Sequence, residues 1–200
     1  VMYGLFSLWF VEHPSFGFWQ IFTHMFMHGG LTHIFFNMYA LWAFGGALEH
    51  MWGGKKFLFF YLSAGLGAAL IHTGVNYYFY LNGIQALEAG GFAAEQVISL
   101  LGQGQYSPAW YEAAGQDTVN AMIEAVSTPA VGASGAIYGI LVAFGMAFPN
   151  SELFLMFVPV PIKAKYFIPV LIGLDLFSGI TGYSIFGSGI AHFAHVGGAL

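Results

Sequence analysis

Two residue types in this chain are suited to nucleophilic catalysis, and they lie far apart in the sequence. Ser134 stands in the run Gly132-Ala133-Ser134-Gly135, while His192 and His195 lie near the end of the chain. A serine hydroxyl is a weak nucleophile that needs an adjacent base, and imidazole titrates in the right range. The two histidines are three residues apart and share one helix face, so spacing alone does not choose between them.

The surroundings of Ser134 favour a site at the start of a helix. Serines in membrane helices usually bond back to a backbone carbonyl or allow helices to approach each other. Here glycine lies on both sides, and the apolar run that follows predicts that Ser134 opens a helix, whose free N–H groups can stabilise an oxyanion. Ala136 replaces the last glycine of the Gly-x-Ser-x-Gly elbow of soluble hydrolases. Tyr138 lies one turn later on the same helix face.

A second polar cluster consists of His24, His28, His33 and Asn37. Such side chains can donate hydrogen bonds to an oxyanion, bond between helices, or, in the case of the histidines, hold zinc or haem. The sequence contains no His-Glu-x-x-His run, which argues against a zinc protease. Asp175 has no second intramembrane acid, which argues against an aspartyl pair, and the lack of cysteine excludes thiolate chemistry. No metal or cofactor is predicted.

The elements that must position these residues are predicted to be membrane helices. Hydrophobic residues make up 58 % of the 200 residues and charged residues 6 %, against about a quarter charged in a soluble domain. A bilayer core needs about 20 mostly apolar residues per helix. The candidate spans are 31–48, 57–80, 131–148, 166–180 and a truncated one at 189–200, after a membrane-surface segment at 1–30 that carries at most the stub of an earlier span.

The charges predict one orientation for these spans. All basic residues are lysines in two short loops, Lys55-Lys56 and Lys163/Lys165. Lysine-rich short loops stay cytoplasmic, and the two loops are separated by two spans, so both lie on one side. With this topology the serine, the second polar cluster and the histidine pair all enter the membrane from the opposite side, within two turns of the surface.

The segment at about 74–128 has a different character. It contains five acids and no base: Glu88, Glu95, Glu112, Asp117 and Glu124. Apolar residues recur with helical spacing around 93–101 and 110–123. We therefore expect an external acidic insertion with two amphipathic helices in an otherwise single domain over 1–200. The chain has no basic cluster, so no nucleic-acid partner is predicted.

Three motifs resemble those of rhomboid intramembrane proteases. The run His28-Gly29-Gly30-Leu31-Thr32-His33-Ile34-Phe35-Phe36-Asn37 resembles the second-span motif of that family. Gly132-Ala133-Ser134-Gly135 resembles its Gly-x-Ser-Gly nucleophile motif in the fourth span, and Ala194-His195-Val196-Gly197-Gly198 its Ala-His-x-x-Gly motif in the sixth. The order and the side of the membrane agree over nearly the whole chain except 74–128. Many rhomboids carry Trp-Arg in the first loop, where this chain has Trp19-Gln20.

The resemblance implies a role for each matching residue. Ser134 would be the nucleophile and His195 the base, selected over His192 because Gly198 follows three residues later, in a dyad without an aspartate. Tyr138 would pack against the His195 ring.

The resemblance also implies an oxyanion hole. His33 and Asn37 would line it with the backbone N–H of Ser134, and Gly132 and His28 would lie at the same site.

Together these inferences predict an all-α, polytopic membrane bundle with a rhomboid-like six-span core, in which the first span is missing or a stub and the last is truncated. The predicted function is an intramembrane serine endopeptidase that cleaves single-span membrane proteins in the lipid bilayer through an acyl-enzyme. The expected location is a bacterial inner membrane, with the active site open to the non-cytoplasmic side. The alternatives are a non-catalytic rhomboid-like protein that binds membrane clients, and a transporter or haem protein that uses the histidines.

Overall fold

The computed structural model describes residues 2–154, 160–183 and 191–200, which form two compact units. The first unit contains the chain up to His24 and Thr73–Ala130, and the second contains Met25–His72 and Val131–Leu200. Helix α5 (Gly54–Ala89) contributes its residues up to His72 to the second unit and the rest to the first. Every residue predicted at the catalytic site, apart from the looser candidate His24, lies in the second unit.

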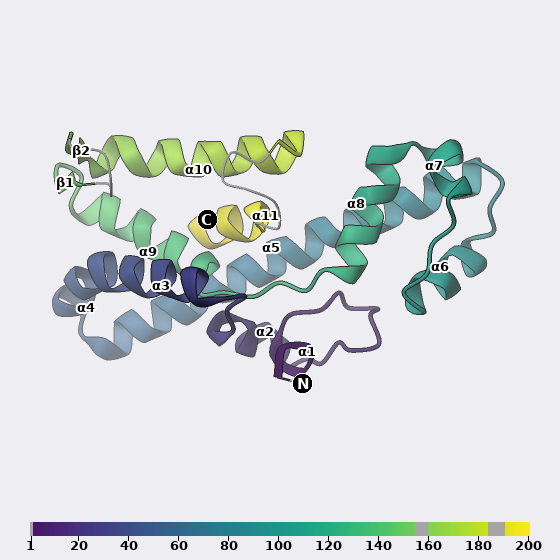
Figure 1. The fold of residues 1–200 in the computed structure, drawn as a ribbon. Coiled ribbons are helices and arrows are strands. Elements are labelled where there is room, and N and C mark those ends of the chain that lie inside the picture. Colours follow the sequence, from purple (N-terminus) through teal and green to yellow (C-terminus); the bar gives the residue numbers. More distant parts are fainter. Residues whose placement is uncertain (1, 155–159, 184–190) are drawn as a thin grey trace. The chain divides into compact units, whose positions relative to one another are not determined.

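The second unit is built around α9 (Ser134–Ala147), an apolar helix that ends just before Pro149. It contacts α3 (Leu31–Ala40), α4 (Gly46–Trp52), α10 (Ala164–Thr181) and α11 (His192–Ala199) (Figure 1). A π-helical turn at Leu41–Gly45 joins α3 to α4. Because neighbours cover it on several sides, α9 buries most of its first three turns, including Ile137, Ile140 and Leu141.

Small residues allow these helices to approach closely. A Cβ added at Gly135 would lie 2.5 Å from the Cβ of Ala68 on α5, and one added at Gly139 would lie 2.5 Å from the Cβ of Ala64. Only glycine on α9 leaves room for the alanines of α5 at this separation. The glycine-rich sequence around Ser134 thus fixes how near the neighbouring helices come.

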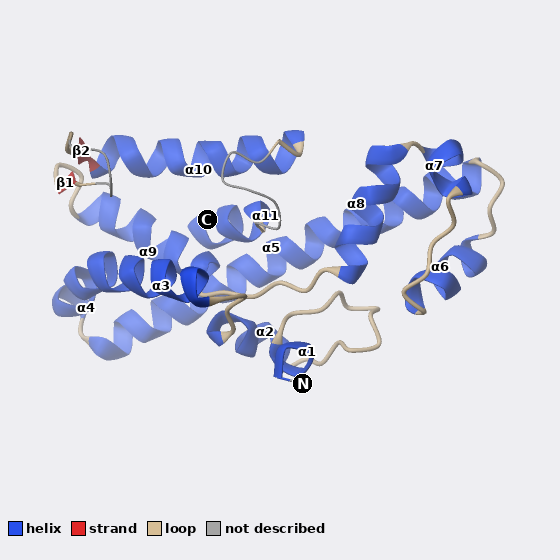
Figure 2. Ribbon diagram, viewed as in Figure 1, coloured by secondary structure: helices blue, strands red, loops and turns tan. Residues whose placement is uncertain are grey.

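A short hairpin precedes α10. Strands β1 (Glu152–Leu153) and β2 (Ile162–Lys163) pair antiparallel, with Glu152 opposite Lys163 and Leu153 opposite Ile162 (Figure 2). Helix α10 then runs to Thr181, where Gly182 adopts the left-handed conformation (φ 71°) that commonly ends a helix.

The first unit has its own core. Its helices are α1 (Met2–Phe6), α2 (Gln20–Thr23), α6 (Ala94–Gly102), α7 (Ala109–Ala114) and α8 (Gln116–Ser127). A 3₁₀ turn at His24–Phe26 follows α2 and continues into the second unit. Trp110, Val97 and Val119 pack with Leu87 from the end of α5. One helix was predicted over 110–123, whereas the structure has two, because Gly115 (φ 80°) breaks the run between α7 and α8.

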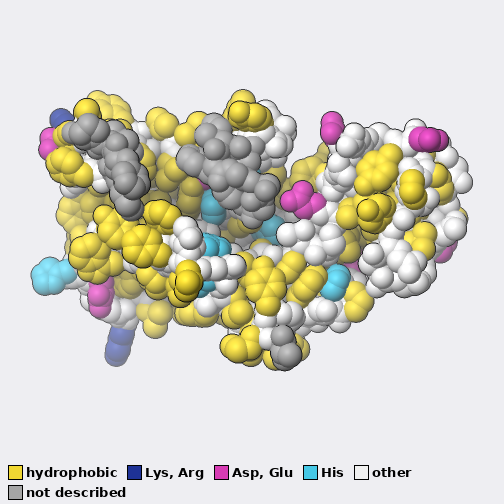
Figure 3. Space-filling view, viewed as in Figure 1, with side chains coloured by type: hydrophobic (Ala, Val, Ile, Leu, Met, Phe, Trp, Pro, Cys, Tyr) yellow, Lys and Arg dark blue, Asp and Glu magenta, His cyan; other side chains and the backbone are white. Residues whose placement is uncertain are grey.

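Two helices among the described residues are long and apolar enough to cross a membrane: α5 and α10. Helix α9 is a shorter apolar helix of 14 residues. Exposed hydrophobic side chains cover the second unit where α3 and α4 lie (Figure 3). The mostly helical fold with membrane-capable helices is therefore confirmed, while the six-span core and the single domain with an insertion at 74–128 stay predictions. The expected start of the last span near Gly189 lies outside the described residues.

Candidate active site

Ser134 and His195 are brought together although they are 61 positions apart. Ser134 is the first residue of α9, and His195 lies in the first turn of α11. The serine Oγ is 2.8 Å from Nε2 of His195, within the reach that proton transfer between a nucleophile and its base requires. Ser134 is half-buried while both of its neighbours, Ala133 and Gly135, are buried. The hydroxyl is therefore paired with the imidazole in a residue that is not fully buried.

Two further groups hold the His195 ring. The ring of Tyr138 stacks on it, with 4.4 Å between centroids and 11° between planes. On the edge away from Ser134, Nδ1 of His195 lies 3.2 Å from Oδ1 of Asp175, a residue of α10. The family resemblance implied a dyad without an aspartate, so this carboxylate is a feature that the motifs did not indicate.

Asp175 is almost completely buried, with 1 % of its surface exposed. Its Oδ1 is also 2.5 Å from Nδ1 of His192, and its Oδ2 accepts a hydrogen bond from the hydroxyl of Tyr138. His192 therefore does not face Ser134 in the way His195 does, but contacts the carboxylate behind it. The sequence did contain a signal that Asp175 matters, since it is the one acid in an apolar 18-residue helix. Ionisable residues inside membrane helices usually have a function.

His33 lies on the other side of Ser134, against Gly132. A Cβ added at Gly132 would be 2.8 Å from Nε2 of His33 and 3.5 Å from Oγ of Ser134. Gly132 also has a φ of 123°, a backbone conformation that residues with a side chain rarely adopt. Gly29 N–H donates to Nδ1 of His33 over 3.3 Å, so the neutral ring carries its proton on Nε2, the atom that faces Gly132 and the serine.

Asn37 and His28 complete the predicted set. Asn37 follows His33 by one turn of α3, which places both on one helix face. Its side-chain Nδ2 is buried and has no hydrogen-bond partner among the described residues. The His28 ring packs edge-on against that of His33, with 5.2 Å between centroids. Burial lowers the pKa of His28 below its ordinary value, which favours the neutral ring.

The earlier polar cluster is divided between the two units. His24 belongs to the first unit, where its Nδ1 lies 2.9 Å from the carbonyl oxygen of Gln20. That short contact within its own turn accounts for His24 without a role at Ser134.

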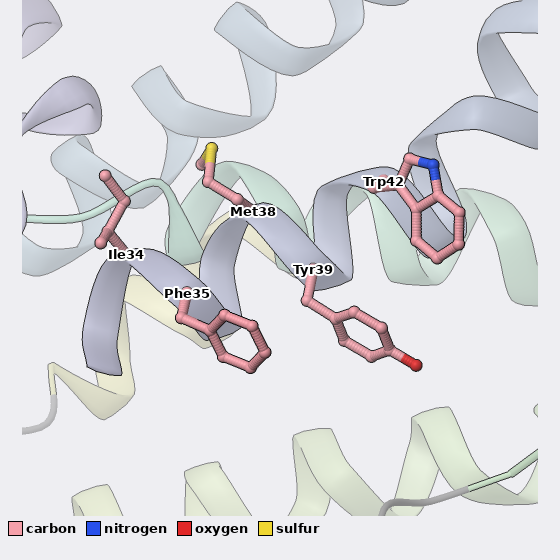
Figure 4. Close-up of a pocket in the computed structure, with 5 residues that line it drawn as sticks. All are labelled: Ile34, Phe35, Met38, Tyr39 and Trp42. Atoms are coloured by element: carbon pink, nitrogen blue, oxygen red, sulfur yellow. The ribbon is translucent and has the colours of Figure 1, made fainter. Parts of the chain in front are cut away.

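An apolar groove lies along α3 and the turn after it, lined by Ile34, Phe35, Met38, Tyr39 and Trp42 (Figure 4). Phe35 and Tyr39 point to the same side of the helix, with nearly parallel rings. Neither Ser134, His195, His33 nor Asn37 lines this groove. Its character is that of a surface suited to lipid or to an apolar helix rather than to bond cleavage.

Comparisons with known proteins agree on one family. The family model described as "Rhomboid domain" matches residues 15–200. The presenilin-associated rhomboid-like protein, mitochondrial, of Bos taurus is 28 % identical over 176 residues, which are 88 % of this chain and 34 % of that protein. Rhomboid protein 1, mitochondrial, of Saccharomyces cerevisiae is 25 % identical over 136 residues, 68 % of this chain and 27 % of that protein.

A bacterial relative matches a smaller part. Rhomboid protease GluP of Bacillus subtilis is 40 % identical over 52 residues, 26 % of this chain and 10 % of that protein. The chain spans about a third of the length of the mitochondrial protein from Bos taurus. No solved structure matches the chain.

The relatives correct the expected location. A bacterial inner membrane with the site open to the non-cytoplasmic side was predicted, and this is wrong, because the presenilin-associated rhomboid-like proteins and Rhomboid protein 1, which match 68–88 % of the chain, are named as mitochondrial proteins. The physical reason is that hydropathy and lysine asymmetry report spans and their relative orientation. Neither property distinguishes one kind of energised membrane from another.

Proposed function

This chain belongs to the rhomboid family, and we propose that it is an intramembrane serine endopeptidase that cleaves the membrane segments of other membrane proteins. The observation that carries the proposal is the distance of 2.8 Å between Oγ of Ser134 and Nε2 of His195. A serine and a histidine at this separation are placed to act as a nucleophile and its general base.

The chemistry runs in two steps. His195 Nε2 accepts the proton of Ser134 as Oγ attacks the scissile carbonyl, and the tetrahedral intermediate collapses when His195 returns the proton to the leaving amine. A water molecule, activated by the same imidazole, then hydrolyses the acyl-enzyme and restores Ser134. Both steps require substrate and water to reach the hydroxyl of Ser134, which is only half-buried as a residue.

An oxyanion site beside Ser134 fits the same residues. The tautomer favoured by Gly29 N–H puts a donor on Nε2 of His33, next to Gly132 and Ser134. Asn37 offers a buried amide N–H₂ without a partner in the described part of the chain, and leaving such a donor unpaired costs about 1–3 kcal/mol. A developing oxyanion would be a suitable acceptor for both groups.

The wider setting of the site also belongs to this proposal. The chain would form part of a six-span rhomboid-like core, with an acidic insertion at 74–128. It would act on single-span proteins in a mitochondrial membrane, in line with the names of the relatives that match most of it. The retained pair Ser134–His195 favours an enzyme over a non-catalytic protein that binds membrane clients.

The test is covalent labelling of the purified protein with a serine-directed fluorophosphonate, with mass spectrometry to locate the adduct. We expect the adduct on Ser134 and its loss in Ser134→Ala. Cleavage of a model single-span substrate should be lost in the same variant. A protein that binds such substrates but neither labels at Ser134 nor cleaves them would be the non-catalytic alternative.

A further inference from the structure

A single buried acid lies behind the Ser134–His195 pair, and the two-residue mechanism gives it no task. Asp175 is 1 % exposed and is the only acidic residue of α10. An ionised carboxylate in such a place is costly unless donors surround it. The contacts of Asp175 must therefore stabilise a negative charge inside an apolar helix bundle.

Three donors meet this carboxylate among the residues that the structure describes. Nδ1 of His195 and Nδ1 of His192 both lie near Oδ1, at 3.2 and 2.5 Å, and the Tyr138 hydroxyl bonds to Oδ2. They come from α11 and α9, so the carboxylate of α10 ties together the helix of the nucleophile and the helix of the base.

The contact with Asp175 decides where His195 carries its proton. An ionised carboxylate only accepts hydrogen bonds, so the ring must present N–H at Nδ1. In the neutral imidazole Nε2 is then an acceptor, and this atom faces the hydroxyl of Ser134. The opposite tautomer would turn a lone pair toward the carboxylate and an N–H toward the hydroxyl it is meant to deprotonate.

We infer that Asp175 is a positioning residue for the base: its carboxylate fixes the Nδ1–H tautomer and the orientation of His195, and lies beside the imidazolium that forms when Ser134 gives up its proton. The inference rests on the proposed protease function. Tyr138 and His192 in turn hold the carboxylate, the first through Oδ2 and the second through Oδ1. The site thus works with an acid, although the sequence motifs identify only a serine and a histidine.

Asp175→Asn tests the charge with little change of shape. The amide keeps an oxygen for one histidine but cannot supply the negative charge or enforce the tautomer. The equivalent change in the triad of a soluble serine protease lowers kcat about 10⁴-fold. Because Tyr138 also holds the ring by stacking, we expect a smaller loss here, about 100-fold or more in kcat, with KM within about twofold.

The rate of fluorophosphonate labelling at Ser134 should fall with kcat, since labelling needs the base but no peptide substrate. Ser178→Ala is the matched control, because Ser178 is buried one turn further along the same helix and its hydroxyl has no partner in the described residues. It should cleave and label close to the parent rate. Thermal unfolding of each variant shows whether a loss reflects a damaged fold.

A measurement on the unaltered protein covers the case in which Asp175→Asn does not fold. In ¹⁵N-histidine-labelled protein, with the His195 signals identified by their loss in His195→Gln, neutral His195 should be protonated at Nδ1. Protonation at Nε2, or an Asp175→Asn variant that cleaves and labels at the parent rate, overturns the positioning role while the protease function stands. A parent protein that does not label at Ser134 removes the proposed function instead.

Discussion

Gly198 of α11 lies so close to Gly135 of α9 that a Cβ added at residue 198 would be 1.8 Å from the carbonyl oxygen of Gly135. The obstacle is backbone, which cannot rotate away as a side chain can. Gly198 lies three residues after His195 and Gly135 one residue after Ser134, so this contact limits how far apart α11 and α9 lie at these two side chains. We therefore expect the distance of 2.8 Å between Oγ of Ser134 and Nε2 of His195 to depend on this contact.

Gly198→Ala should therefore push α11 away from α9. Forcing extra volume into a packed contact costs about 1–3 kcal/mol, and a shift of about 1 Å at a reactive pair can lower the rate about 100-fold. We expect a lower midpoint of thermal unfolding and a large loss of cleavage of a model single-span substrate.

Gly173→Ala is the control for that substitution. A Cβ at Gly173 on α10 would meet no atom within 4 Å, and alanine favours a helix over glycine by about 1 kcal/mol. This variant should be as stable as the parent or more so, with unchanged cleavage. Equal activity of Gly198→Ala and Gly173→Ala would mean that the close contact does not position the site.

The sequence indicated helices and motifs better than it indicated contacts. The apolar runs predicted the helix that Ser134 opens and the long apolar helix that begins near residue 57, because burial in lipid leaves a direct record in composition. The predicted span of 57–80 was too short, because the helix continues to Ala89. Residues 74–89 end in the packed cluster around Trp110 and Leu87, and such tertiary packing has no local signature.

Asp175 shows why part of the site could not be predicted. The sequence presented it as an isolated acid, since its partners lie 17, 20 and 37 positions away. Helical spacing relates residues three or four apart on one helix, but it does not say which face of α10 meets α9 and α11. For the same reason spacing could not separate His195 from His192, and only the resemblance to a family motif did so.

Gly132→Ala should impair cleavage without removing any functional group. The residue has a φ of 123°, and a Cβ there would come within 2.8 Å of Nε2 of His33. Both the backbone conformation and the ring must change, at a cost of about 1–3 kcal/mol for the backbone strain alone. We expect at least a tenfold loss of kcat, measured as initial cleavage rates at saturating substrate. A variant with parental kcat would show that the loop before Ser134 adapts freely.

His33→Ala and Asn37→Ala should each slow the chemical step. Loss of one oxyanion donor in a serine protease lowers kcat about 10²–10³-fold, or about 3 kcal/mol. The two residues share one face of α3, and one of them presents an unpaired buried N–H₂. The measurement is kcat and KM for a model substrate, with an effect expected on kcat.

Thr32→Ala serves as the matched control for those two variants, because Thr32 is exposed in the first turn of the same helix. It should keep parental kcat. If the His33 and Asn37 variants also cleave at the parent rate, these side chains bond between helices and do not bind the oxyanion.

The last prediction separates the two histidines of α11. His195→Ala should abolish cleavage as completely as Ser134→Ala, since removing the base of a soluble serine protease costs about 10⁶-fold in kcat. The double variant should lose little more, because residues that act as a unit are not additive. His192→Ala removes one of the donors to Asp175 but leaves those of His195 and Tyr138. A hydrogen bond to a charged group is worth about 1.5–3 kcal/mol, or roughly 10- to 150-fold in rate, so this variant should retain measurable activity.

One cleavage assay on the four variants, with fluorophosphonate labelling in parallel, makes the comparison. An inactive His192→Ala beside an active His195→Ala would assign the base to His192 and contradict the geometry, in which only the Nε2 of His195 lies 2.8 Å from the serine among the described contacts. Equal, partial losses in both variants would mean that either imidazole can reach Ser134, which requires α11 to rotate by about 60°, the offset between residues three apart on a helix. Full activity of Ser134→Ala would exclude the serine mechanism altogether, whatever the two histidines do.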